Sequence, residues 1–115
     1  MDETLARKVG NTLSSVYGDS LVKEIEIEIL KSRSYEGKKE HFNELLVISD
    51  VAALVISTIG VAHQIFTHQK GKKSKDKKSH LKDQVLEVTE LKGDISELDV
   101  EKVSEAVVSE LEDMN

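Results

Sequence analysis

The amino-acid sequence predicts a small α+β domain with a long central apolar helix, short antiparallel strands and an amphipathic C-terminal helix. Three observations lead to this fold class: a mostly apolar run over residues 45–66, a strict alternation of Glu and Ile over residues 24–29, and apolar residues at helical spacing near both ends. The chain has 115 residues, the length of one domain, so residues 1–115 are expected to form a single domain. Aromatic residues make up only 3% of the chain, so the core must be aliphatic. The alternative fold is an all-α bundle of about five helices.

The first predicted element is an amphipathic helix over residues 3–17. Its apolar residues recur at spacings of three and four, which places them on one face of a helix. Gly18 follows, and glycine is a common helix stop. The apolar face comprises Leu5, Val9, Leu13, Val16 and Tyr17.

Residues 21–33 fit two kinds of element. Glu and Ile alternate from Glu24 to Ile29, which is typical of a half-buried strand. A helical face is matched as well, by Leu21, Val22, Ile25 and Ile29, and Glu favours helices over strands. Three isoleucines at a spacing of two favour the strand, and the predicted α+β fold includes this strand. Residues 32–39 then predict a loop.

The long central helix is predicted over residues 39–68. Its apolar part, residues 45–66, has about the 20 residues that a membrane span requires, although Asp50 interrupts it near one end. Small and polar residues share one stripe of this helix, and small residues let another helix approach closely. The stripe predicts an interaction surface formed by Asp50, Ala53, Ser57 and Gly60.

A lysine-rich segment follows the apolar helix directly. Residues 69–80 contain no apolar side chain and therefore predict a mobile loop. Its lysines are candidates for contact with an anionic surface such as a membrane. Nucleic acid is not an expected partner, because the segment has no aromatic residue to stack on a base and no Arg to read one. Alternatively, the lysines pair with the acidic segment 83–115. The candidates are Lys70, Lys72, Lys73, Lys75, Lys77 and Lys78.

Residues 81–115 also allow two arrangements. In the first, residues 85–98 form an antiparallel hairpin around Gly93, and the predicted α+β fold includes this hairpin. In the second, residues 81–92 form a helix that Gly93 ends, and Ser96 caps the next helix. Both arrangements end in an amphipathic helix. The apolar face of this last helix is a second candidate interaction surface, formed by Val103, Val107 and Leu111.

No set of residues predicts catalysis, a metal or a cofactor. The chain has no Cys, and its four His are not spaced as metal ligands usually are. It contains no Gly-x-Ser-x-Gly nucleophile motif and no glycine-rich phosphate loop. Ser57 shares a stripe with Asp50, but no His lies near both, as a triad would require. The chain is therefore not expected to be an enzyme, and no cofactor is expected.

The predicted elements over residues 21–113 follow a recognisable order: an alternating strand, a long apolar helix, a basic linker, a hydrophobic hairpin and an amphipathic helix. The closest local likeness lies in Leu86-Glu87-Val88-Thr89, Gly93, Glu97-Leu98-Asp99 and Val103. In this order and these residues, the chain resembles the effector-associated constant component domains of bacterial conflict systems. The resemblance implies an α+β fold and a non-enzymatic adaptor that accompanies proteases, NTPases or other effectors in defence-type signalling.

The sequence thus predicts a non-enzymatic protein–protein interaction module that binds a protein partner or a second copy through aliphatic helix faces. The acidic N-terminus lacks the basic start and apolar core of a signal peptide, so a cytoplasmic location is expected. The alternative is a small membrane-attached protein at the inner face of a membrane. In that case the helix at 45–66 is inserted and the lysine-rich segment is its cytoplasmic flank.

Overall fold

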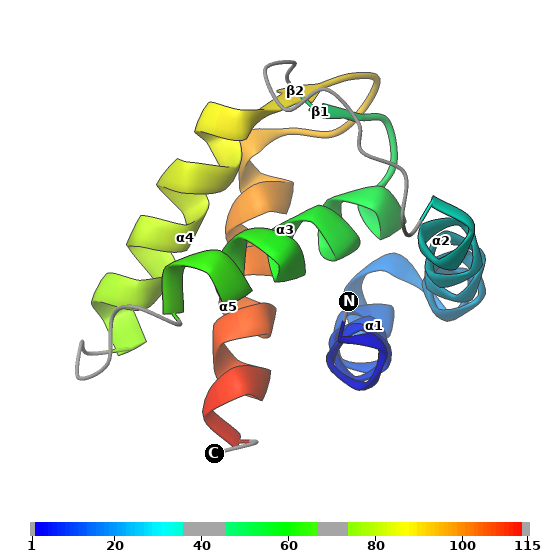
Figure 1. The fold of residues 1–115 in the computed structure, drawn as a ribbon, viewed down its shortest axis with the longest axis horizontal. Helices are drawn as coiled ribbons and strands as arrows, with labels where there is room; N and C mark the ends of the chain where they lie inside the picture. The colour runs from blue at the N-terminus through cyan, green and yellow to red at the C-terminus, as the bar shows by residue number, and fades with distance from the viewer. Residues whose placement is uncertain (1, 36–45, 67–73, 114–115) are drawn as a thin grey trace.

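The computed structural model describes residues 2–35, 46–66 and 74–113, and these form a mostly helical fold. Within these ranges there are five helices and one small sheet of two strands (Figure 1). This architecture corresponds to the all-α alternative better than to the α+β prediction. In chain order the elements are α1 (Glu3–Tyr17), α2 (Ser20–Tyr35), β1 (Leu46–Ile48), α3 (Val51–Phe66), α4 (Ser74–Val88), β2 (Thr89–Leu91) and α5 (Glu97–Asp113).

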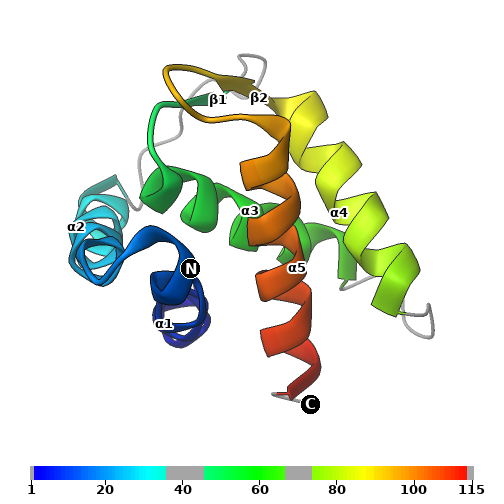
Figure 2. The ribbon, with the colours of Figure 1, turned by 180° about the vertical axis from the view of Figure 1, so that it is seen from behind.

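Helix α3 is central, because it contacts each of the other four described helices. The α1–α2 pair lies at one end of α3 and the α4–α5 pair crosses its other part (Figure 1). Seen from behind, α5 crosses α3 between α1 and α4 (Figure 2). The two-stranded sheet lies at the top of both views, above α3. The core between these elements is aliphatic, as the composition predicts.

Helix α1 has the predicted bounds. Its first turn is capped by Asp2, whose Oδ1 accepts a hydrogen bond from the Leu5 backbone N–H at 2.9 Å. Gly18 ends the helix with a φ of 92°, a backbone conformation that glycine adopts without a steric cost. On the predicted apolar face, Leu5, Val9 and Leu13 are buried and Tyr17 is half-buried, whereas Val16 is 55% exposed.

Helix α2 replaces the strand predicted over residues 24–29, and that prediction is wrong. Leu21, Ile25 and Ile29 recur every four residues and are each 1% exposed, so the helical pattern buries one complete face. Ile27, which the strand would have buried with them, is 52% exposed. The pattern of period two therefore arose from one exposed isoleucine between two buried ones.

The central helix is shorter than predicted. Strand β1 occupies residues 46–48, and α3 begins at Val51 because Asp50 caps it: the Asp50 Oδ1 accepts a hydrogen bond from the Ala53 N–H at 2.8 Å. The predicted residues 39–45 and 67–68 lie outside the described part of the chain. Within the described ranges, no helix combines the length and the apolar character needed to cross a membrane.

The antiparallel hairpin predicted over residues 85–98 is also wrong. Helix α4 continues to Val88, and the following residues 89–91 pair in parallel with β1, with Val47 opposite Glu90. Helix α4 also includes residues 74–80, which belonged to the predicted mobile loop; residues 69–73 lie outside the described ranges. Burial of Leu81 and Val85 anchors α4 in the core, and the polar residues before Leu81 extend the same helix.

The second arrangement predicted for residues 81–115 is closer to the structure, but its first helix ends at Val88 and β2 follows, so Gly93 does not end a helix. Gly93 has a φ of 64° and turns the chain after β2. Ser96 then caps α5, and Asp99 Oδ2 accepts a hydrogen bond from the Ser96 backbone N–H at 2.9 Å, which is the reciprocal half of a capping box. The Val100 N–H donates to the Ser96 carbonyl at 3.2 Å and starts the helical hydrogen bonds.

Candidate interaction surface

The predicted stripe of α3 lies together on the outward side of the helix. Asp50 and Gly60 are exposed, while Ala53 and Ser57 are half-buried. A Cβ atom built on Gly60 would meet no atom within 4 Å, so the space above this residue is open. The predicted stripe therefore faces outward, with Asp50 and Gly60 exposed at its two ends and the residues between them half-buried.

The opposite side of α3 explains why this stripe faces outward. Ala52, Val55, Ile59 and Ala62 recur at helical spacing and are at most 1% exposed. They pack into the aliphatic core that all five helices share. Because the larger aliphatic residues take the inner side, the small stripe is left on the outside.

Asp50 has a local structural role in addition to its place on the stripe. Its carboxylate caps α3 through Ala53, and its backbone carbonyl accepts from the Leu54 N–H at 3.1 Å. The carboxylate of an N-cap also interacts favourably with the positive end of the helix dipole. Asp50 therefore sets where the helix begins, and Ala53, Ser57 and Gly60 are the members of the stripe that lie within the helix.

The second predicted interaction surface is part of the core. Val103 and Val107 on α5 are 0% exposed, and Leu111 is half-buried against the same core. Helix α5 packs against α1, α3 and α4 and thus has its apolar face covered from within the chain. The prediction that this face binds a partner is wrong, because the amphipathic pattern cannot distinguish internal from external burial.

Two lysines of α4 face the acidic helix α5. Lys78 Nζ lies 3.7 Å from Glu105 Oε2, and Lys82 Nζ lies 3.8 Å from Glu101 Oε2. Lys77 lies over the ring of Phe66, 5.8 Å from its centroid. The structure thus brings two lysines to the acidic segment, which is the alternative that the sequence left open. The structure does not describe Lys70, Lys72 and Lys73 or the side chain of Lys75.

A polar connection between α1 and α5 was not predicted. Tyr17 Oη donates a hydrogen bond to Asp99 Oδ1 at 2.5 Å, and Lys102 Nζ lies 5.9 Å from the centroid of the Tyr17 ring. Partial burial raises the pKa of Asp99, but the hydrogen bonds from Tyr17 and Ser96 outweigh it, so the pKa lies below its usual value. Burial and the same bond raise the pKa of Tyr17. The spacing of Ser96 and Asp99 indicates the cap, whereas no sequence pattern indicates Tyr17.

Charged side chains join α1 to α2 in a second unpredicted cluster. Arg7 donates to both carboxylate oxygens of Glu26, with Nε at 2.6 Å and Nη2 at 3.3 Å, and Arg33 donates to both oxygens of Glu3. These hydrogen bonds from Arg33 and Arg7 lower the pKa values of Glu3 and Glu26 respectively. The cluster fixes the α1–α2 pair and is fully compensated in charge.

Comparison with known proteins adds no family to this description. No protein-family model matches the chain, and neither a curated protein nor a solved structure matches it. Within the described residues, no three His, Cys, Asp or Glu side chains are grouped so that they could hold a metal ion.

Proposed function

We propose that this chain is a non-enzymatic protein interaction module that binds a partner helix on the outward face of α3. The observation that carries the proposal is the outward-facing strip Ala53, Ser57 and Gly60, of which Gly60 is exposed with open space above it and the other two are half-buried. The partner is a protein, and the expected place of action is the cytoplasm.

A strip of this kind suits helix–helix contact for two physical reasons. Small side chains let the backbone of a second helix approach closely, which increases the van der Waals contact along both helices. They also lose little rotamer freedom on binding, so the entropic cost of forming the contact falls mostly on the partner. Ile56, half-buried on the adjoining row of the same helix, adds apolar area at the edge of the strip.

The resemblance to effector-associated domains supplies the class of partner. Two of the elements that carry the resemblance differ in the structure. The alternating strand is a helix, and the antiparallel hairpin is replaced by a helix and a strand that pairs in parallel with β1. The apolar helix and the amphipathic C-terminal helix are present. On the resemblance, the proposed partner is an effector enzyme of a bacterial defence or signalling system, and this chain is its adaptor.

Gly60 offers a sharp test of the α3 surface. Gly60→Leu places a bulky side chain at one end of the strip, where a Cβ atom would meet no atom within 4 Å. We expect it to weaken binding of an effector encoded beside this chain by at least about tenfold, measured by isothermal titration calorimetry. Gly60→Ala is the matched control, because it keeps the residue small; it should retain binding and stabilise the helix by about 0.5–1 kcal/mol.

Both variants must first show the helical circular dichroism spectrum of the unchanged chain. Equal binding by the unchanged chain and Gly60→Leu would remove α3 as the contact surface. If no effector encoded beside this chain binds the unchanged chain at high micromolar concentration, the adaptor proposal itself fails.

A further inference from the structure

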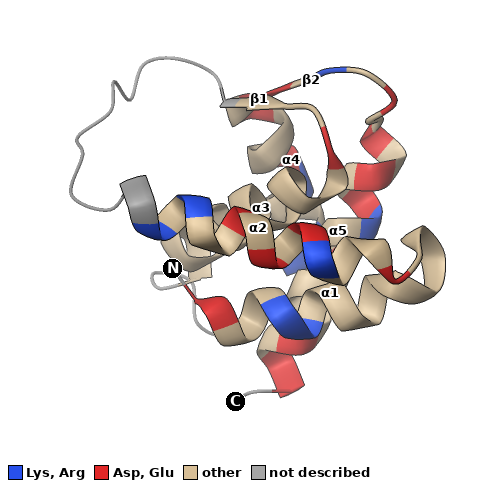
Figure 3. Ribbon diagram, turned by 90° about the vertical axis from the view of Figure 1, so that its right-hand side faces the viewer, with Lys and Arg blue, Asp and Glu red and all other residues tan. Residues whose placement is uncertain are grey.

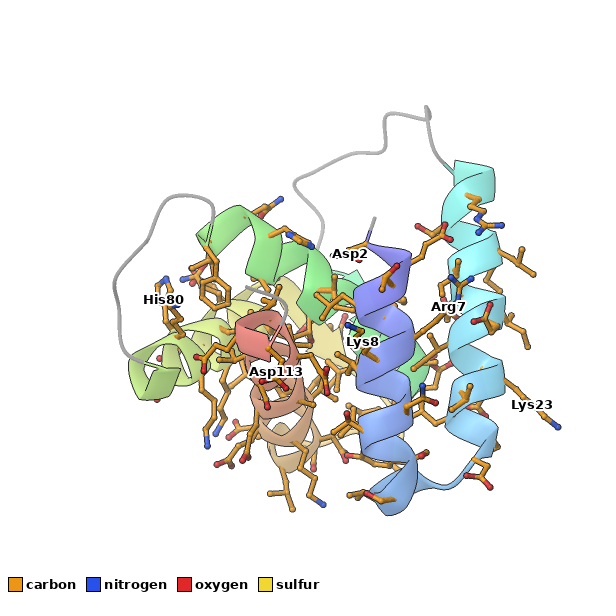
Figure 4. The ribbon with its side chains drawn as sticks, turned by 90° about the horizontal axis from the view of Figure 1, so that it is seen from below. Asp2, Arg7, Lys8, Lys23, His80 and Asp113 are labelled. Carbon is orange, nitrogen blue, oxygen red and sulfur yellow. The ribbon has the colours of Figure 1, made fainter. Side chains whose placement is uncertain are left out.

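The outer face of α2 carries two large apolar side chains that the fold does not bury. Ile27 is 52% exposed and Leu30 is 57% exposed, and they lie one turn apart on the side opposite Leu21, Ile25 and Ile29. Helix α2 crosses the front of the molecule in the view of Figure 3, with charged segments around this face. Figure 4 shows Lys23, from the same face, pointing away from the molecule.

The charged residues beside this pair are arranged so that the face complements itself. Glu24 and Lys31 are both exposed and lie on the same flank of the Ile27–Leu30 pair, one near the start of the helix and the other near its end. Lys31 Nζ lies 3.5 Å from Oε1 of the neighbouring Glu28, and the Lys31 side chain is 60% exposed. The flank therefore presents an acidic end and a basic end to any helix that packs on it.

We infer that α2 is a self-association surface that pairs with α2 of a second copy in an antiparallel arrangement. With the pair centred between residues 28 and 29, each Ile27 lies level with Leu30 of the other copy, so four apolar side chains form one cluster. In this antiparallel pair, the two-fold axis places the flank with Glu24 and Lys31 on the same side of the contact in both copies. Glu24 of each copy therefore lies next to Lys31 of the other.

Charge selects this arrangement over the parallel one. In a parallel two-fold pair, this flank of one copy lies on the opposite side of the contact from the same flank of the other copy, so Glu24 and Lys31 do not meet across it. The antiparallel pair brings these opposite charges together on both sides of its centre. A second copy is thus the occupant whose charge pattern the face fits, and the contact uses a different helix from the α3 surface, so neither depends on the other.

The small size of the apolar cluster predicts a weak dimer. Two side chains per copy bury well below the area of a standard stable interface, so dimerisation is expected only at high micromolar to millimolar concentration. Analytical ultracentrifugation over a concentration series should show the mass rising from 12.8 kDa toward twice that value. A mass that stays at 12.8 kDa up to about 1 mM would overturn the inference.

Matched substitutions locate the contact. Ile27→Glu and Leu30→Glu should each weaken dimerisation by at least about tenfold. Val16→Glu and Leu98→Glu, at equally exposed apolar positions on α1 and α5, should leave it unchanged. Because all four positions are exposed, the helical spectrum should be retained in each variant. A dimer that survives Ile27→Glu and Leu30→Glu would exclude α2 as the interface.

The absence of Cys from the sequence allows the orientation to be read directly. In the antiparallel pair the two copies of position 30 lie close together, whereas the two copies of position 23 are about 16 Å apart along the helix axis. A short thiol-reactive cross-linker should therefore join Leu30→Cys and not Lys23→Cys. Cross-linking of both would indicate the parallel pair and overturn the proposed arrangement.

A charge exchange provides an independent check. Glu24→Lys alone or Lys31→Glu alone should weaken dimerisation, because each creates like-charged neighbours across the interface. The double variant Glu24→Lys with Lys31→Glu should restore it. If both single variants dimerise more weakly and the double variant does not regain the original dimer affinity, the proposed Glu24–Lys31 contact is excluded.

Discussion

The α1–α2 pair and the α4–α5 pair both pack on α3, yet charged side chains join them in different ways. In the first pair, Arg7 and Arg33 each donate two hydrogen bonds to a glutamate of the other helix. In the second pair, Lys78 and Lys82 lie 3.7 and 3.8 Å from their glutamates. A guanidinium matches both oxygens of a carboxylate, whereas an ammonium group acts as a point charge. The α1–α2 pair is thus held in one orientation by its charges, and the α4–α5 pair gains only general attraction.

The aliphatic seams under these charges should contribute far more stability than the charges themselves. Ile25 on α2 is 1% exposed and Leu81 on α4 is 0% exposed. We expect Ile25→Ala and Leu81→Ala each to lower the free energy of unfolding by about 2–5 kcal/mol, from lost burial plus the cavity left behind. Urea denaturation followed by circular dichroism measures this.

Both substitutions should preserve one cooperative transition, because α3 packs against both helix pairs and joins them. Two separate transitions in either variant would mean that the pairs unfold independently, which would contradict the central role of α3.

The bond between α1 and α5 should have the next largest effect. Tyr17→Phe removes the hydrogen bond to Asp99 while keeping the ring, so we expect a loss of about 1–2 kcal/mol in the free energy of unfolding. This loss is expected at pH values above 3.8, the usual pKa of Asp99, which applies to the unfolded chain. A lowered pKa stabilises the fold only while the carboxylate is ionised. Thermal unfolding at neutral and acid pH checks this: a loss of equal size at both would exclude the ionised Asp99 as the acceptor.

The smallest effects should separate the two kinds of ion pair. Lys82→Gln should change the free energy of unfolding by less than about 0.5 kcal/mol at neutral pH, because its pair is partly exposed. Arg33→Gln should instead change the acid limb of the stability curve. Arg33 lowers the pKa of Glu3, so its stabilising contribution is complete above the usual value of 4.5 and is lost as the pH falls through the lower folded pKa.

The measurement is the stability of each variant between neutral pH and the acid limb. Arg33→Gln is expected to lose less stability than the unchanged chain as the pH falls below 4.5. Lys82→Gln is the matched control and should follow the unchanged chain. If the unchanged chain and both variants lose the same stability as the pH falls, the hydrogen bonds from Arg33 to Glu3 make no measurable contribution to the stability of the fold.

Elements with a local signal were predictable from the sequence. The N-terminal helix ends at Gly18 because glycine relieves the strain of a positive φ, and Ser96 with Asp99 forms a cap within four residues. The stripe Asp50, Ala53, Ser57 and Gly60 could be placed on one helix face from its spacing alone. Asp50 was read as an interruption of the apolar run, although an Asp before a helical pattern is also a cap signal.

Elements that depend on distant neighbours could not be predicted in the same way. The alternation around Ile27 satisfies a strand and a helix equally, and the choice is made by the α1 and α3 surfaces that bury Ile25 and Ile29. The parallel pairing of β1 with β2 joins segments about forty residues apart, and no local pattern specifies such a pairing.

Helix caps, the aliphatic character of the core and the sets of residues that share a face can be predicted from the chain alone, because they follow from backbone geometry and spacing within a few residues. Whether each apolar face is internal or external depends on how the elements pack together. Val103 and Val107 on α5 became core while Ile27 and Leu30 on α2 stayed at the surface. The physical reason is that burial is a property of the packed assembly: a face is removed from water only when another element of suitable shape reaches it.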